Sequence, residues 1–255
     1  MSLFRLQTLG SLSLHDGSGA AIPGHGSQRR RLALLAVLAA AGERGRSRDS
    51  LLALFWPDAP QERARHSLEQ LLYAIRTSVS NEAFLGVNPI GLNPDVIRSD
   101  VTELERALAE DRLEDAVAEY RGPFLEGFAL PDALEFEPWA DGERARLANA
   151  YARALESLAV SAERRSDFRG AAEWWEKRAA HDPYDSRVAQ CLMRALDASG
   201  NRARAIQHAA THERLLRREL GVQAATGASA LAERLRVEPR AQSSAIAPEA
   251  VAAAT

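Results

Sequence analysis

Apolar residues recur at helical spacing through the first third of the chain. Residues 28–41, QRRRLALLAVLAAA, are almost continuously apolar after a basic start. Two further segments, 47–56 and 60–79, flank a break at Trp56–Pro57, where the residue before a proline is pushed out of the α region. Each has one apolar face, made by Leu51, Leu52, Leu54 and Phe55 in the first and by Ala64, Leu68, Leu71, Leu72, Ile75 and Val79 in the second. This periodicity predicts three helices, the last two forming a helix-turn-helix.

The opposite face of the 60–79 helix has hydrogen-bonding side chains and no carboxylate. Its members are Arg63, His66, Ser67, Gln70, Tyr73 and Thr77, with Glu62 and Glu69 to the sides. A helix that packs on one side and carries such groups on the other suits a DNA major groove. An ordinary amphipathic helix with a solvated polar face explains the same pattern equally well.

Arg29, Arg30 and Arg31 stand in the first turn of the 28–41 helix, where the helix dipole favours acidic residues. A nearby phosphate would explain them, and so would arginines that simply point into solvent. We favour solvent.

Short alternating segments frame this helical region. Residues 3–14 alternate apolar and polar positions around Gly10, which predicts two short strands. In residues 83–100, three apolar runs are separated by Asn88-Pro89 and Asn93-Pro94, which are turn signals and predict a small β-hairpin. A hairpin directly after a helix-turn-helix is the layout of a winged helix.

The remainder of the chain reads as helical. Asp100, with Glu103 three residues later, has the spacing of a capping box at a helix start. Helices are expected at about 101–109, 112–121, 134–164, 168–181, 185–198, 202–219 and 225–236. The loop 121–133 is rich in Phe and Leu, so we expect it to pack against helices. The tail 237–255 is small and polar, and is expected to be disordered.

An internal repeat appears in the second half. Ser166-Asp167 and Gly200-Asn201 each stand between predicted helices and lie 34 residues apart, and Ala171 and Ala205 match at the same offset. A 34-residue helical repeat with small residues at close-packed positions is typical of tetratricopeptide units. Such units stack and present a concave surface.

Charge is distributed unevenly along the chain. The net charge is −3, but residues 1–100 hold 11 arginines against 9 acidic residues, while the remaining residues are acidic overall. The helix-turn-helix region is therefore mildly basic. The chain has one cysteine, Cys191, no charge-free apolar run of about 18 residues and no secretory signal pattern, so we expect a cytoplasmic protein.

The order of these parts resembles a known family. The segment QRRRLALLAVLAAAGERGRSRDSLLALFWPDAPQERARHSLEQLLYAIR resembles the OmpR-type winged helix of SARP regulators. FLEGFALPDALEFEPWADGERARL and the helical sequence after it are similar to the bacterial transcriptional activator domain. The resemblance implies a mainly α fold with small β elements, in which an N-terminal winged helix-turn-helix precedes an all-α tetratricopeptide-like domain. The implied divisions are residues 1–99, 100–236 and a tail at 237–255.

This resemblance implies a sequence-specific, DNA-binding transcriptional regulator, most simply an activator. Its partners would be double-stranded DNA with repeated promoter sites, a second copy of the chain in a homodimer on DNA, and RNA polymerase. The expected base-contacting residues are Arg63, His66, Ser67, Gln70 and Tyr73. The residues expected to contact the DNA backbone are Arg46, Arg48, Arg76, and Asn88 or Arg98 from the wing. Ala74 stands where the family often has a basic residue, which weakens any inference about the end of the recognition helix.

Two other functions were considered. The sequence has no P-loop, nucleophile elbow or Cys/His metal cluster, so we expect no enzyme, cofactor or metal site. His208 and His212 have a spacing that can bind zinc, although two surface histidines are the simpler interpretation. The remaining alternative is a tetratricopeptide-type protein-interaction scaffold whose winged helix no longer binds DNA.

Overall fold

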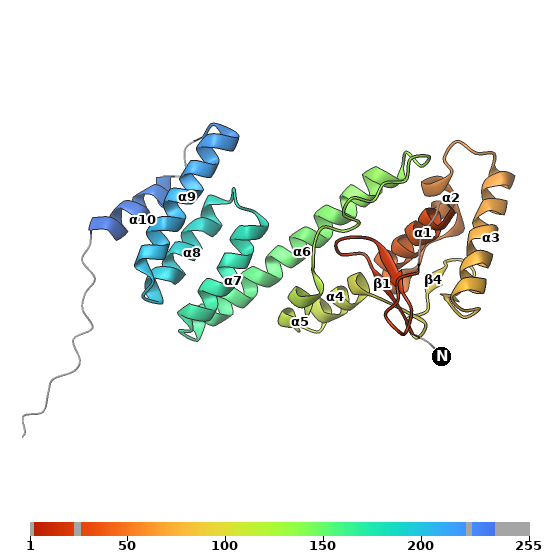
Figure 1. Cartoon of the computed structure of the whole chain (residues 1–255), viewed down its shortest axis with the longest axis horizontal. Coiled ribbons are helices and arrows are strands. Elements are labelled where there is room, and N and C mark those ends of the chain that lie inside the picture. Colours follow the sequence, from red (N-terminus) through yellow and green to blue (C-terminus); the bar gives the residue numbers. More distant parts are fainter. Residues whose placement is uncertain (1–2, 23–26, 223–225, 238–255) are drawn as a thin grey trace, which may run out of the picture. The chain divides into compact units, whose positions relative to one another are not determined.

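The computed structural model describes residues 3–22, 27–222 and 226–237 (Figure 1). The chain divides into two compact units, Met1–Leu158 and Ala159–Thr255. Most of the tail predicted at 237–255 lies outside the described residues, which end at Val237. Within the described ranges, no helix combines the length and the apolar character needed to span a membrane.

Helices dominate both units. In chain order the first unit contains β1 (Phe4–Gln7), β2 (Ser13–His15), α1 (Ser27–Ala41), the 3-10 helix η1 (Gly42–Arg44), α2 (Arg48–Phe55), α3 (Gln61–Ser78), β3 (Phe84–Leu85), β4 (Gly91–Leu92), β5 (Ile97–Ser99), α4 (Asp100–Ala109) and α5 (Leu113–Glu119). Helix α6 (Phe136–Arg164) crosses the division, and α7 (Phe168–His181), α8 (Ser186–Ala198), α9 (Arg202–Leu220) and α10 (Thr226–Val237) follow. The expected mainly α fold with small β elements is confirmed.

The strands form two separate sheets. Strands β3 and β4 pair antiparallel, with Phe84 opposite Leu92, and make the predicted hairpin. The third apolar run behaves differently from the expectation that grouped it with the hairpin. It forms β5, which pairs in parallel with β1 in a three-stranded sheet of order β2-β1-β5. A spacing pattern marks a run as a strand but does not choose its partner, because the partner here is more than 90 residues away.

The predicted helix-turn-helix is formed by α2 and α3. The Ser47 hydroxyl accepts a hydrogen bond from the Ser50 N–H at 3.2 Å and caps the first turn of α2, as a serine at that position should. One continuous core joins α1, α2 and α3. Its fully buried side chains include Leu34, Leu35, Leu38, Leu51, Phe55, Leu68, Leu72 and Ile75.

Asp100 does not form the expected capping box. The cap position of α4 is Ser99, whose side chain makes no capping bond, and Glu103 pairs instead with Arg106 one turn later. The Asp100 carboxylate is buried and accepts hydrogen bonds from Thr8 and Leu9, directly after β1, and from the Val101 N–H of α4. A buried carboxylate needs several donors, and backbone groups at the end of β1 supply more of them than its own helix can.

Arg29 and Arg30, at the start of α1, contact the 121–133 loop and are not simply solvated as expected. Arg29 donates to the Ala129 carbonyl at 3.1 Å, and its guanidinium lies 5.3 Å from the centre of the Phe128 ring. Arg30 lies over the Trp56 ring at 5.9 Å. The expectation that the loop packs against helices is confirmed, since Phe124 and Leu125 are fully buried within it.

The second unit contains the predicted repeat. Helices α7 and α9 begin directly after Asp167 and Asn201, and α8 packs against both (Figure 1). The Asp167 side chain caps α7 by accepting from the Gly170 N–H at 2.9 Å. Ala171 and Ala205, the matching small residues, are both fully buried, which lets neighbouring helices approach closely.

The interpretation of His208 and His212 as surface residues is wrong for His212. Its ring is buried, with Nδ1 3.0 Å from the Pro183 carbonyl and Nε2 3.0 Å from the Ser186 hydroxyl. His208 is half-buried one turn away, with the two ring centres 6.4 Å apart. Among the described residues, no group of three or more potential ligands could hold a metal ion.

Candidate nucleic-acid interface

Helix α3 separates its apolar and polar sides sharply. Ala64, Leu68, Leu72 and Ile75 are buried on one side. The opposite side is open: Arg63, His66, Gln70, Tyr73 and Thr77 are exposed, and only Ser67 among the predicted contact residues of this face is half-buried. Tyr73 keeps 71% of its surface exposed, which is unusual for a large aromatic side chain. The structure therefore places five of the six polar positions where a ligand could reach them.

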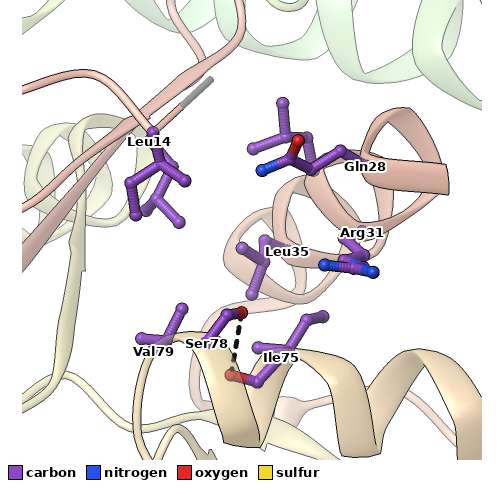
Figure 2. Close-up of a pocket in the computed structure, with 9 residues that line it drawn as sticks. Leu14, Gln28, Arg31, Leu35, Ile75, Ser78 and Val79 are labelled. Atoms are coloured by element: carbon purple, nitrogen blue, oxygen red, sulfur yellow. Dashed lines mark hydrogen bonds between the residues drawn. The ribbon is translucent and has the colours of Figure 1, made fainter. Parts of the chain in front are cut away.

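The back of α3 is held firmly against the rest of the unit. Its last turn meets α1 and β2 around a cavity of only about 20 Å³, lined by Leu14, Arg31, Leu35 and Ile75 among others (Figure 2). The apolar side chains on this side of the helix, Leu68, Leu72 and Ile75, are almost completely buried. Tight packing behind the helix fixes the direction in which its polar side faces.

Two hydrogen bonds order side chains on the open face. The Gln70 side-chain amide nitrogen lies 2.9 Å from His66 Nε2, one turn earlier on the helix. The Thr77 hydroxyl donates to the Tyr73 carbonyl at 3.0 Å, so its proton is committed to the helix backbone. His66 and Gln70 are therefore linked by a side-chain hydrogen bond on the open face of α3.

Arg48 connects α2, α3 and the hairpin. Its guanidinium pairs with Glu69 of α3 and donates through Nε to the Val87 carbonyl at 3.1 Å. Its backbone N–H donates to the Asn88 side-chain oxygen at 3.0 Å, which satisfies an otherwise unpaired amide at the start of α2. The structure brings Arg48 and Asn88 together, and it gives both of them a structural task besides any contact with DNA.

Arg76 and Arg46 also lie near the hairpin. The Arg76 guanidinium lies 5.5 Å from the centre of the Phe84 ring in β3. Arg46 pairs with Ile90 through two backbone hydrogen bonds of 2.8 Å and joins the segment before α2 to the hairpin. Both side chains are half-buried. The Phe84 ring positions the Arg76 guanidinium at the hairpin, and the backbone pairing positions Arg46 at the other hairpin strand.

Arg98 does not belong to the wing, contrary to the expectation. It lies on β5, directly opposite Arg5 of β1 in the parallel pair, and its side chain is exposed. Arg98 therefore belongs to a different sheet from β3 and β4, the hairpin strands near which the other candidates for contact with the DNA backbone gather.

Several residues of this region were not predicted from the sequence. Glu69 pairs with Arg48, and Phe84 supports Arg76. At the tip of the hairpin, Leu85 and Val87 remain 51% and 75% exposed. The apolar spacing of 83–87 identified a strand but carried no signal for its exposed residues, because exposure depends on which elements cover it.

Two comparisons with known proteins found matches to this chain. Residues 98–236 match the family model described as the bacterial transcriptional activator domain. The solved structure of Mycobacterium tuberculosis EmbR in complex with a low-affinity phosphopeptide is similar over 94% of this chain, with 21% identity and a TM-score of 0.58. The similarity covers 66% of the EmbR chain, slightly under two thirds, and it shows a shared fold. No curated protein matches.

Proposed function

This chain belongs to the bacterial transcriptional activator domain family. On that premise we propose that it is a SARP-type transcriptional regulator that binds DNA sequence-specifically through α3. The observation that carries the proposal is the open polar face of α3. Arg63, His66, Gln70 and Tyr73 are exposed there, while the opposite side of the helix is locked into the core. An amphipathic helix with this arrangement fits the B-DNA major groove.

Base recognition would come from the side chains that carry directional hydrogen-bonding groups. Arg63 has the fork geometry that pairs with guanine O6 and N7, and Gln70 has the donor and acceptor that pair with adenine. Each such bidentate contact typically contributes about 1–3 kcal/mol of discrimination against the wrong base. Ser67, His66 and Tyr73 would supply additional contacts along the same groove.

Phosphate contacts would fix the register of α3 without reading sequence. Arg46, Arg48 and Arg76 stand beside the hairpin, and Asn88 keeps amide donors at its turn. Arg98 would have to contact the DNA backbone from its position in the N-terminal sheet. The Arg48–Glu69 pair would reduce the positive charge that Arg48 offers to a phosphate.

A single copy would make few base contacts, so we propose paired binding sites occupied by a homodimer. The helical domain, which we place at residues 100–236 after a DNA-binding domain at 1–99, would contact RNA polymerase. Bacterial transcription takes place in the cytoplasm, where we place this activity.

Selection of duplexes from a randomised DNA pool tests the proposal, followed by mobility-shift titrations of the selected sequence. Gln70→Ala should weaken binding to the selected site about tenfold or more and leave binding to unrelated DNA nearly unchanged. Arg76→Ala should weaken both and reduce the salt dependence by about one unit of log–log slope. Arg169→Ala, an exposed arginine on α7, is the matched control and should change neither. Failure of the full chain to retain any duplex would contradict DNA binding and favour the protein-interaction scaffold.

A further inference from the structure

His66 and Gln70 form a hydrogen-bonded pair on the open face of α3. They are four residues apart, both side chains are exposed, and His66 Nε2 lies 2.9 Å from the Gln70 amide nitrogen. The pair is therefore at the surface that the proposed function assigns to the DNA bases.

The structure places the Gln70 amide nitrogen toward His66 Nε2, and the position of the imidazole proton follows from this placement. The Gln70 amide nitrogen can only donate, so His66 Nε2 must accept. An accepting Nε2 is unprotonated, which places the proton of the neutral ring on Nδ1. In this state Gln70 directs its amide nitrogen toward His66 and keeps its oxygen and one N–H for a ligand.

We propose that His66 is a positioning residue that selects which groups of Gln70 face the DNA, so that the base preferred by Gln70 depends on the protonation of His66. The inference rests on the proposed function. With a neutral ring, Gln70 offers one donor and one acceptor, the pattern that matches adenine N7 and N6. Specificity for that base would then be determined by His66 and Gln70 together and not by Gln70 alone.

Protonation reverses the arrangement. A second proton makes His66 Nε2 a donor, and the only Gln70 atom that accepts is its side-chain oxygen. The amide must then turn by about 180°, since nitrogen and oxygen lie on opposite sides of the group. Its two N–H groups now face outward, a donor pattern that matches the acceptors of guanine or thymine O4 and no longer matches adenine.

Charged side chains of α3 and α2 lie around His66. Along α3, Glu62 lies one turn before His66 and pairs with Arg65 at 3.6 Å, and Arg63 and Glu69 flank the pair. From α2, Arg48 is already paired with Glu69. The hairpin residues 84–92 contain no charged side chain. Histidine is the side chain that ordinarily changes charge between pH 5 and 8.

The first test measures base preference. Duplexes carrying each of the four bases at every position of the selected site are titrated with the full chain at pH 6 and pH 8. At one position the preference for adenine over guanine should fall about tenfold between pH 8 and pH 6. In Gln70→Ala that position should show little preference at either pH.

Two substitutions at His66 distinguish a residue that positions the Gln70 amide from one that only supports the fold. His66→Gln does not titrate, and its amide can accept from Gln70 or donate to it, so its base preference should be the same at both pH values. His66→Lys can only donate, so it should show the guanine or thymine preference at both. An unchanged base preference between pH 6 and pH 8 in the parent chain, or a pH-dependent preference that survives in His66→Gln, overturns the inference.

A second test needs no DNA. Nitrogen-15 chemical shifts of the free protein should show the neutral His66 ring protonated on Nδ1, and the Gln70 side-chain amide signals should move together with the imidazole titration. Uncoupled signals overturn the inference even if DNA binding is observed. Coupled signals in a chain that retains no duplex would instead show that the pair exists and that the proposed function is wrong.

Discussion

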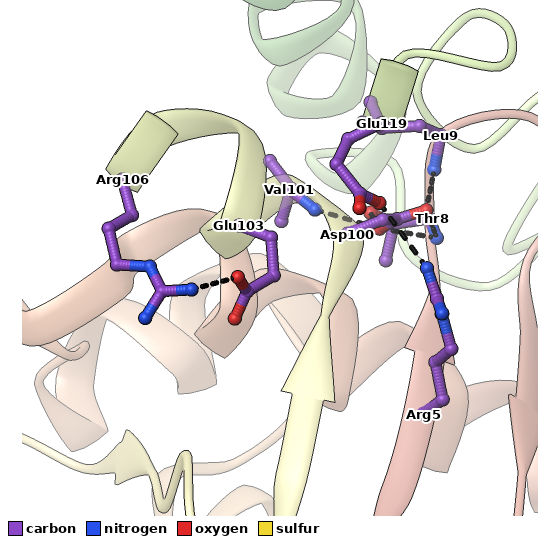
Figure 3. Close-up of polar contacts among 8 residues, drawn as sticks. All are labelled: Arg5, Thr8, Leu9, Asp100, Val101, Glu103, Arg106 and Glu119. Carbon is purple, nitrogen blue, oxygen red and sulfur yellow. Dashed lines mark hydrogen bonds and ion pairs between the residues drawn. The ribbon is translucent and has the colours of Figure 1, made fainter. Parts of the chain in front are cut away.

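Asp100 and Thr8 are joined by three hydrogen bonds across 92 residues of sequence (Figure 3). The Thr8 hydroxyl donates to one carboxylate oxygen at 2.6 Å, and the Thr8 N–H lies 2.9 and 2.8 Å from the two oxygens. The Leu9 N–H donates as well, at 2.8 Å. The carboxylate thereby ties the end of β1 to the first residue of α4, at the start of the family-matched segment.

Replacing this carboxylate should destabilise the first unit. Asp100→Ala leaves buried donors of Thr8 and Leu9 without an acceptor, and unsatisfied buried donors cost about 1–3 kcal/mol each. We expect a loss of roughly 3 kcal/mol in the free energy of unfolding, measured by denaturant titration. Glu103→Ala removes an exposed pair with Arg106 and should cost less than about 0.5 kcal/mol. Equal losses in the two variants would instead indicate a capping box.

Removing the charge of Glu69 should strengthen binding to DNA. In Glu69→Gln the Arg48 guanidinium loses its carboxylate partner and can neutralise a phosphate. The slope of log affinity against log salt should become steeper by about one unit. Glu173→Gln, which releases Arg169 of α7 in the same way, serves as the control. A slope that does not change in Glu69→Gln would mean that Arg48 does not reach the DNA backbone.

Trp175 is expected to be essential for the stability of the second unit. It is 2% exposed, and its indole N–H donates to Glu163 at 2.8 Å. Trp175→Ala should lower the free energy of unfolding by about 3–5 kcal/mol, since it leaves a large cavity among α7, α8 and their neighbours. The adjacent Trp174 is half-buried and lies over Lys177, so Trp174→Ala should have a clearly smaller effect. Amide hydrogen exchange in α7 and α8 would measure both.

Stability should fall on mild acidification because of His208. Burial lowers the pKa of His208 below its ordinary value, and the nearby His212 lowers it further. The folded chain therefore binds fewer protons than the unfolded chain, in which a histidine titrates at about pH 6.5. Above that pH the histidine is neutral in both states and folding carries no penalty from it. As the pH falls below it, the unfolded chain takes up the proton first, and the free energy of unfolding decreases. Thermal unfolding of the parent chain and of His208→Gln between pH 7.5 and 5.5 checks this, and an equally steep pH dependence in the variant would contradict it.

Local sequence determined the elements of this protein. The 3.6-residue period placed α2 and α3 around the Trp56–Pro57 break, and the 34-residue offset placed the starts of α7 and α9. The 3.6-residue period also identified the open side of α3, because the apolar stripe from Ala64 to Ile75 leaves only the opposite side for polar residues. These features follow from neighbours within one or two turns, which spacing reports directly.

Only the tertiary structure decided what the polar side chains do. The Asp100 carboxylate joins Thr8 to α4, Arg30 lies over Trp56, and His212 is buried against Pro183 and Ser186. Arg98 lies in the N-terminal sheet, paired with β1, and not in the hairpin that its position in sequence suggested. The physical reason is the same in each case. A long polar or charged side chain can form a hydrogen bond or ion pair with any partner that the fold brings within reach. The spacing of residues along the chain does not identify partners that are dozens of residues away.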